Sequence, residues 1–554
     1  MTHAGNIMAA VLLTSVAAAA FGRGDGERTE VTFTCGLESN TIYYVRDDGV
    51  PSYVRPTHAV GSNNWLKGDI TAGRFSAGLQ FEYYPVPLQG YPSELQGIGL
   101  PGKYVSWTDR QWSITAGDFY EQFGSGIVFR SWEDRELGIN NSIGGARLTF
   151  NVLKDALQGR FLFGFPRYYL RSEGMGYPLF RNFLDAYSRT RVAGGDVSLS
   201  LLRLAAPSSD HDLTIEGSVV ARFENALPSS LAFLASQNGI AVPSGVVSWS
   251  ARAAWSWSGL TVKAEYAGKS TDLSLDGSLE LKNGNAQLVE INYSSGGFSG
   301  AVTLRRLSNM QSPMFRSDAG ITAGNTLNYL PSLSQQQSYM LASLNPCTTF
   351  AEGEAGGQID LFYNFRRGTK LGGRYGMKLH VNGSMIYGLA SALPDRTTAR
   401  MSYRDITIDL EKRWNPKFKT VFFVSIQENS PTHGNRKRTD AQNVFVVDAQ
   451  YKFTQRLSLR AELQYLYSEE LTRDWMAGLL ELSFAPRWSF YVSDMYNHGS
   501  TRVHYYSAGI GYSHSFLRVS AGYGRNREGM VCSGGVCRWQ PAYTGGNLQL
   551  SLSF

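Results

Sequence analysis

The chain has 554 residues, a formal net charge of +6 and 18% charged residues, with 59 Gly, 30 Tyr and 29 Phe. This composition is typical of strands, turns and interfacial aromatic side chains. The mean hydropathy of −0.22 excludes a polytopic helical membrane protein. Because the basic residues are spread along the chain rather than gathered in one stripe, the sequence also argues against nucleic acid as a partner.

The first segment with a distinct pattern is the apolar run from Ile7 to Phe21, which ends in Ala17 to Ala20. Its length is typical of the core of an export signal and is too short to cross a membrane as a helix. The residues before it contain no Lys or Arg, which departs from the usual pattern, so an ordinary buried segment stays open as the alternative. We predict a signal peptide at residues 1–20, with cleavage near Ala20, and a single domain at residues 21–554.

Alternation of apolar and polar side chains begins near Val31 to Tyr44 and continues to the last residue. Arg456 to Tyr467 is the clearest segment, and its apolar face comprises Leu457, Leu459, Ala461, Leu463, Tyr465 and Tyr467. Because successive strand side chains point to opposite faces, such a segment separates an apolar wall from a polar one. Many of the segments run about a dozen residues, the length of a tilted membrane strand and about twice that of a soluble strand.

The connections between these segments are short and long in turn. Short turns are predicted at residues 73–74, 109–110, 258–259, 296–297, 415–416, 454–455, 485–486 and 514–515, and longer links at residues 85–102, 225–245 and 311–353. Short periplasmic turns with longer outer loops are typical of outer-membrane barrels. The sequence therefore predicts a single large antiparallel transmembrane β-barrel of roughly 24 strands, with both termini on the periplasmic side.

Two segments do not fit the strand pattern. Residues 118–141 contain a charged Trp-Glu-Asp-Arg-Glu stretch, and residues 311–353 form the longest link in the chain. We interpret both as outer loops or inward excursions, although a further hairpin in the first segment stays open. A barrel of this size is wider than the porins, and wide barrels are generally plugged. No separate N-terminal plug is recognisable, so these two segments are the best candidates for narrowing the lumen.

Cys532 and Cys537 are separated by Ser-Gly-Gly-Val, and the two glycines allow the tight turn that would bring the sulfur atoms together. In an oxidising compartment a small disulfide loop is favoured, and a metal-binding pair is the rival. Whether Cys35 and Cys347 pair is left open by the sequence.

The last strand alternates without a break and ends on an aromatic residue, which places Leu548, Leu550, Leu552 and Phe554 on one face. This resembles the C-terminal signal that the barrel-assembly machinery reads in outer-membrane proteins. The resemblance implies an outer-membrane location in contact with lipid, and biogenesis through periplasmic chaperones and that machinery.

A closer resemblance rests on Gly117 to Gly126, on Leu137 to Ser142, and on the tail from Gly529 through Cys532, Cys537 and Arg538 to Phe554. These stretches resemble an outer-membrane β-barrel family of Bacteroidota that has no assigned activity. The resemblance implies the same fold and location and supplies no site residues.

The sequence does not indicate a catalytic, phosphate-binding or metal-binding site. Gly268-Lys269-Ser270 lacks the first glycine and the following helix of a phosphate-binding loop. His498, His504 and His514 are not spaced as metal ligands, and no Gly-x-Ser-x-Gly elbow is present. We therefore predict no catalytic residue, metal or cofactor, with an outer-membrane hydrolase as a minor alternative. The aromatic residues near strand ends are interpreted as membrane-interface girdles rather than sugar platforms: Trp255, Trp257, Trp414, Trp475, Trp488, Tyr505 and Tyr506.

The sequence favours a passive or gated channel for a polar solute, with a lumen of mixed charge. The alternative is a structural or interaction barrel that docks an outer-membrane protein, surface proteins or export machinery through its outer loops.

Overall fold

The computed structural model describes residues 30–50, 53–167, 190–224, 227–274, 279–316, 325–393, 398–435, 439–469 and 473–554. No helix within these ranges is long and apolar enough to cross a membrane. The described chain is dominated by one sheet of 24 strands. These are β1 (Val31–Val45), β2 (Val60–Ala72), β3 (Phe75–Val86), β4 (Gly97–Thr108), β5 (Trp112–Phe119), β10 (Ile143–Val152), β11 (Leu157–Pro166), β12 (Arg191–Ser200), β13 (His211–Phe223), β14 (Gly245–Trp257), β15 (Leu260–Leu273), β16 (Leu281–Ser295), β17 (Phe298–Ser308), β18 (Gly353–Phe365), β19 (Met377–Gly388), β20 (Arg400–Arg413), β21 (Phe418–Asn429), β22 (Asp440–Lys452), β23 (Leu457–Tyr467), β24 (Trp475–Phe484), β25 (Trp488–Tyr496), β26 (His504–His514), β27 (Leu517–Asn526) and β30 (Tyr543–Ser553).

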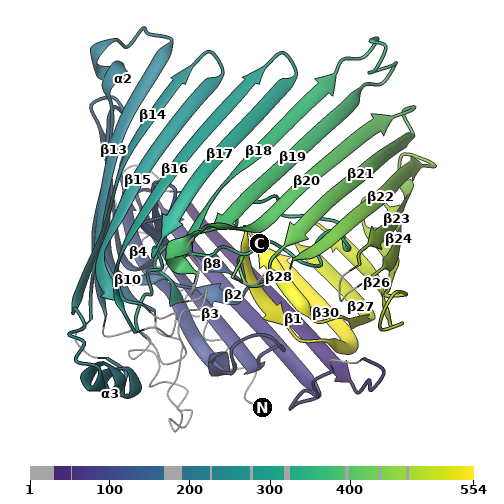
Figure 1. Ribbon diagram of the computed structural model, residues 1–554, viewed down its shortest axis with the longest axis horizontal. Coiled ribbons are helices and arrows are strands. Elements are labelled where there is room, and N and C mark those ends of the chain that lie inside the picture. Colours follow the sequence, from purple (N-terminus) through teal and green to yellow (C-terminus); the bar gives the residue numbers. More distant parts are fainter. Residues whose placement is uncertain are drawn as a thin grey trace.

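Each strand pairs antiparallel with the next strand of the sheet, and β5 pairs directly with β10 and β27 with β30. The sheet closes where β1 pairs with β30, from Gly36 opposite Ser553 to Val45 opposite Thr544. Figure 1 shows the first and last strands side by side. Closure leaves no strand edge unpaired, as a structure in lipid requires. The predicted all-β class and strand number are confirmed.

Alternation along each strand separates two environments. On β23 the outward side chains of Leu463, Tyr465 and Tyr467 are 71%, 37% and 43% exposed, whereas the inward Glu462 and Gln464 are 4% exposed. Large exposed apolar side chains continue around the outer wall on other strands, including Phe163, Val219, Leu304, Ile406 and Phe445. An apolar surface of this extent around a closed barrel is typical of barrels that lie in a membrane.

The two ends of the barrel differ in their connections as predicted, except that the β12–β13 link (residues 201–210) and the β18–β19 link (residues 366–376) are long although they lie at the end with the short turns. Two- to four-residue turns such as 73–74, 258–259, 296–297 and 485–487 lie at the same end as both termini of the barrel. Long links lie at the other end, including the β13–β14 link, whose helix α3 (Ser229–Gln237) projects away from the barrel (Figure 1). The predicted 85–102 link is shorter than expected, because β3 extends to Val86 and β4 begins at Gly97. Smaller elements in the links are α2 (Leu201–Ala205), η1 (Ser93–Leu95) and η4 (Ala390–Ala392).

Within the described ranges, six short strands lie outside the barrel wall. They are β6 (Glu121–Phe123), β7 (Phe129–Ser131), β8 (Glu133–Asp134), β9 (Ile139–Asn140), β28 (Gly529–Ser533) and β29 (Val536–Gln540), which pair as three separate hairpins. The segment between β5 and β10 therefore contains two hairpins, and it turns inward rather than extending the wall. The predicted signal peptide at residues 1–20 lies outside the described residues.

The predicted aromatic girdle is wrong at two positions. Trp257, Trp414, Trp488 and Tyr506 are 40–51% exposed on the outer wall. Trp475 is only 6% exposed and stacks on Tyr505 inside the barrel, with 5.9 Å between ring centroids. Both rings pack against apolar side chains of a loop that enters the barrel. The position of a residue near a strand end does not reveal such a loop, so the prediction failed there.

Candidate functional site

Three inward segments occupy the lumen, and we name them by their residues. The inner hairpins are residues 120–142, the strap is residues 325–352 of the β17–β18 link, and the C-terminal hairpin is β28–β29 at residues 529–540. Together they decide how much of the wide barrel stays open.

The inner hairpins are fixed by an apolar cluster. Phe123 and Phe129 are fully buried and pack with Val192 and Val220 of the wall. The same cluster includes Met314 and Leu327 from the β17–β18 link. Because each large apolar side chain contributes about 1.5–3 kcal/mol on full burial, the cluster holds both segments firmly against one side of the barrel.

The strap then crosses to the opposite wall. Its Leu341, Ala342 and Leu344 pack in a second cluster with side chains of β21 to β25: Phe423, Val444, Val446, Leu466, Trp475, Ala477 and Met495. Polar contacts accompany this packing, because the Leu341 amide donates to Gln464 Oε1 at 2.9 Å and Gln427 Nε2 donates to the Ala342 carbonyl at 3.1 Å. The strap therefore divides the lumen rather than lying along one wall.

Buried ion pairs anchor the link to the wall. Asp272 of β15 accepts from Arg222 Nη2 at 2.7 Å and from Arg316 Nη2 at 2.8 Å, and all three side chains are 2% exposed. Arg305 of β17 pairs with Glu354 of the neighbouring β18 at 2.7 Å, and its Nη1 donates to the Pro331 carbonyl of the strap at 2.6 Å. Such pairs favour one arrangement of the link, because either partner left alone would be a buried, uncompensated charge.

The C-terminal hairpin rests on the strap. Cys532 and Cys537 form the predicted disulfide across β28 and β29. The Ser332 amide donates to the Gly535 carbonyl at 3.0 Å, and Gln336 Nε2 donates to the Cys532 carbonyl. Gly535 has φ +77, and a Cβ there would lie 2.9 Å from Pro331, so the close approach requires glycine. The disulfide thus rigidifies a hairpin that closes over the strap.

Cys35 and Cys347 do not pair. Cys35 lies on β1 on the same face as the exposed Phe33, whereas Cys347 lies inside the barrel in a cluster with Leu333, Ile386 and Tyr403. The barrel wall therefore separates the two thiols, which the sequence could not show.

Cys347 is only 5% exposed, and this burial raises the pKa of its thiol to about 12. A raised thiol pKa means that the reactive thiolate is scarce at pH 8, by roughly a thousandfold relative to an ordinary cysteine. We expect a Cys35→Ala variant to resist maleimide labelling when folded and to be labelled once per chain in urea. Stoichiometric labelling of the folded protein within minutes would contradict this placement of the strap.

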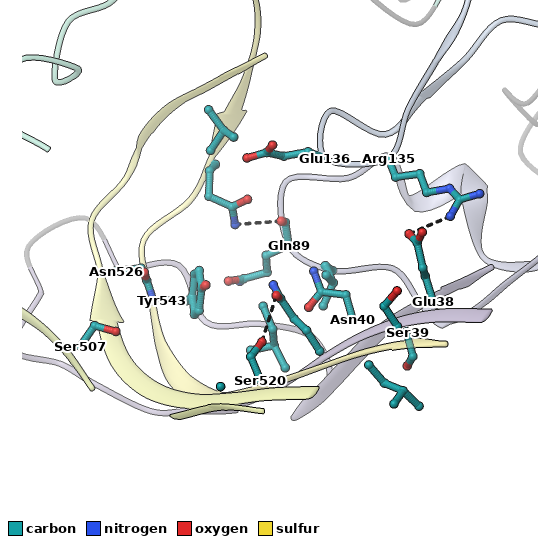
Figure 2. A pocket seen from close by; sticks show the side chains of 18 of the residues that line it. Glu38, Ser39, Asn40, Gln89, Arg135, Glu136, Ser507, Ser520, Asn526 and Tyr543 are labelled. Atoms are coloured by element: carbon teal, nitrogen blue, oxygen red, sulfur yellow. Dashed lines mark hydrogen bonds and ion pairs between the residues drawn. The ribbon is translucent and has the colours of Figure 1, made fainter. Parts of the chain in front are cut away.

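Beside the inward segments lies a cavity of about 970 Å³, which we call the passage. Its wall is formed by β25 to β27, β30 and β1, and its other side by the inward segments (Figure 2). Small polar residues line the wall, among them Ser489, Ser493, Ser507, Gly511, Ser513, Ser520, Asn40, Gln549 and Ser551. On β27 the lining extends from Arg518 to Asn526, which is about 26 Å along a strand. The passage therefore follows the wall over most of its height.

The end of the passage nearest the long loops is bordered by a knot of polar side chains. Arg538 of the C-terminal hairpin stacks over Tyr91 with its guanidinium carbon 4.2 Å from the ring centroid, and its Nε donates to the Glu136 carbonyl at 2.8 Å. Gln540 Nε2 donates to the Gln89 carbonyl at 2.9 Å. Three segments distant in sequence thus meet here, and this knot is the natural place for a constriction.

The charged residues of the passage have two kinds of environment. Figure 2 shows the ion pair between Arg135 and Glu38, in which Nη1 lies 2.7 Å from Oε2. Arg525 Nε lies 2.7 Å from Asp47 Oδ2. Arg487 and Arg518 are exposed near the turn end, and no ion pair to either is recorded among the described residues. Arg487 and Arg518 therefore present positive charge that a solute in the passage can contact.

Within the described ranges no group of three His, Cys, Asp or Glu side chains could hold a metal ion. Ser402 Oγ lies 3.4 Å from His433 Nδ1, but that ring stacks on Phe350 at 4.7 Å. Among the described contacts this Ser–His pair lacks the carboxylate of a hydrolase triad.

Comparison with solved structures finds large barrels. The translocation pore of the P pilus usher PapC aligns with 94% of this chain and 99% of its own at 10% identity, with a TM-score of 0.42. The siderophore receptor PirA from Pseudomonas aeruginosa (95% of this chain, 81% of its own, 10% identity) and the copper transporter OprC (96%, 82%, 11%) both have TM-scores of 0.41.

No curated protein matches the sequence significantly. A protein-family model does match, over residues 6–554, and it is described as a family of unknown function (DUF6029). The chain belongs to this family.

Proposed function

We propose that this chain is an integral outer-membrane barrel through which small polar solutes diffuse along the passage. The observation that carries the proposal is the cavity of about 970 Å³ that follows the wall of β25 to β27, β30 and β1 while inward segments occupy the rest of the lumen. Serine, glycine, asparagine and glutamine offer hydrogen bonds to a passing solute without binding it tightly, and weak contacts of this kind permit diffusion.

The outer-membrane location is supported by the apolar outer wall and by strands of 8 to 15 residues, which suit a tilted crossing of a bilayer. Leu548 and Phe554 are 49% and 63% exposed, and Phe554 stacks on Phe516 at 4.9 Å between centroids. That face is accessible to lipid, and its recognition by assembly machinery stays a prediction.

Liposome swelling tests the proposal. Liposomes that contain the purified, folded chain should swell in isotonic solutions of small neutral polar solutes, and the rate should fall steeply as solute size grows, because the passage is narrow. A matched sample of heat-unfolded protein serves as the control. Swelling no faster than in protein-free liposomes would contradict a diffusion role.

An interaction barrel is the second candidate, because the inward segments fill most of the lumen. A barrel of that kind should be silent in the swelling assay and should co-purify with a stoichiometric partner protein. The two functions therefore differ in a measurement made on the isolated chain.

A further inference from the structure

Positively charged side chains outnumber negatively charged ones along the passage. Six arginines and three glutamates line it: Arg135, Arg487, Arg518, Arg525, Arg527, Arg538, Glu38, Glu136 and Glu528. A guanidinium stays charged at any physiological pH, so this excess of positive charge does not depend on titration.

Two of the arginines are neutralised locally. Arg135 pairs with Glu38, and Arg525 pairs with Asp47, which lies on the β1–β2 link. When these ion pairs are set aside, four arginines and two glutamates of the lining remain, so positive charge is still in excess.

The remaining arginines are distributed along the route rather than gathered at one point. Arg487 and Arg518 are exposed where the wall meets the short turns. Arg538 lies in the knot at the other end, where its charge-bearing group contacts Tyr91, a carbonyl and an amide oxygen. A solute that enters from either end would thus meet positive charge at both ends of the passage.

Several acidic residues elsewhere in the lumen are held by basic partners. Asp448 and Glu462 lie within 2.9 Å of Arg460, and Glu411 lies 3.2 Å from Lys378 and from Lys419. Glu481 faces inward on β24 and accepts from Ser483, outside the lining of the passage. These contacts reduce the opposing field from the other walls without reversing it.

From this asymmetry we infer that the passage prefers anions, and that its natural solutes are small organic or inorganic anions bearing a carboxylate or phosphate. This inference rests on the proposed diffusion function. A narrow route with low-dielectric walls focuses the field of its lining charges, and rings or rows of Arg select anions in other pores. Arg also presents paired N–H donors that match carboxylate and phosphate oxygens.

The test is the reversal potential of the reconstituted chain in a planar bilayer under a KCl gradient. Chloride should be several-fold more permeant than potassium. In the double variant Arg487→Gln, Arg518→Gln, whose substitutions are at exposed positions, this preference should fall close to unity. Lys417→Gln, which removes an exposed charge from the β20–β21 turn outside the lining of the passage, is the matched control and should leave the preference unchanged. Inorganic phosphate added to the chloride solution should reduce the current of the natural chain more than that of the double variant.

The outcomes separate the inference from the function on which it rests. Conductance that favours potassium, or chloride preference that survives loss of both arginines, would overturn anion selection and leave a diffusion channel. A folded barrel without conductance would overturn both.

Discussion

Removing residues 335–345 from the strap should raise the single-channel conductance several-fold. These residues carry Leu341, Ala342 and Leu344 across the lumen to the β21–β25 wall. Without them, the passage would widen into the space that the strap now fills. The deletion can be closed with a short Gly-Ser linker, because Leu333 and Cys347 on either side of it lie in one cluster. The barrel should still close, because its backbone pairing does not involve the strap.

A loop deletion of similar size provides the control. Residues 229–237 form α3, which projects from the β13–β14 link away from the barrel (Figure 1). The Glu224 amide donates to the Ser244 carbonyl at 2.7 Å, so the ends of that link are already close together. Conductance of this variant should match the natural chain. Equal conductance in all three proteins would show that the strap does not obstruct the pore.

The second large effect is expected at Asp272. Asp272→Ala leaves Arg222 and Arg316 buried without their shared carboxylate, and removing one partner of a buried pair costs about 3–5 kcal/mol. We expect the free energy of unfolding in urea to fall by about that amount and the β17–β18 link to become sensitive to protease. In this variant Arg316 retains its 3.5 Å contact with Glu224 and a hydrogen bond to the Pro243 carbonyl at 2.8 Å.

Asp48→Ala is the matched comparison. It removes a carboxylate from the Arg46–Asp48 pair, whose side chains are 70% and 69% exposed, so the unfolding free energy should hardly change. If both variants unfold at the same urea concentration, the anchoring role of Asp272 is wrong.

The wall of the barrel could be predicted from sequence because its signal is local. Each strand alternates with a period of two, and the short turns interrupt that pattern at regular points. The Cys532–Cys537 disulfide was predictable for the same reason, since both cysteines lie on one tight hairpin. None of these features depends on knowing which distant residues meet.

The contents of the lumen were harder to predict. A lumen filled with water would be polar, yet Val444, Val446 and Leu466 face inward and are at most 2% exposed, because the strap covers them. The sequence does carry a trace of this arrangement. In Val444-Phe445-Val446-Val447 both faces of the strand are apolar, as in a strand buried on both sides, which marks where something packs inside the barrel.

The passage itself depends on contacts that no local pattern encodes. Tyr91, Glu136 and Arg538 belong to three different links and meet only in the fold. Ser520 and Gln549 follow the ordinary alternation of their strands, and nothing in their spacing distinguishes a lined cavity from a filled lumen. Those positions could be recognised only when the paths of the inward segments were known.

Blocking the passage at one introduced cysteine tests the proposed route most directly. In a Cys35→Ala background, Ser520→Cys places a thiol on the wall of the passage, and Ser299→Cys places one in a separate hollow beside β16 and β18. Single-channel conductance would be recorded before and after a bulky water-soluble thiol reagent is added. Diffusion along the passage predicts a large loss of conductance for the Ser520→Cys protein and little change for the Ser299→Cys protein. Unchanged conductance after complete modification at position 520, with block from position 299, would place the route elsewhere in the barrel.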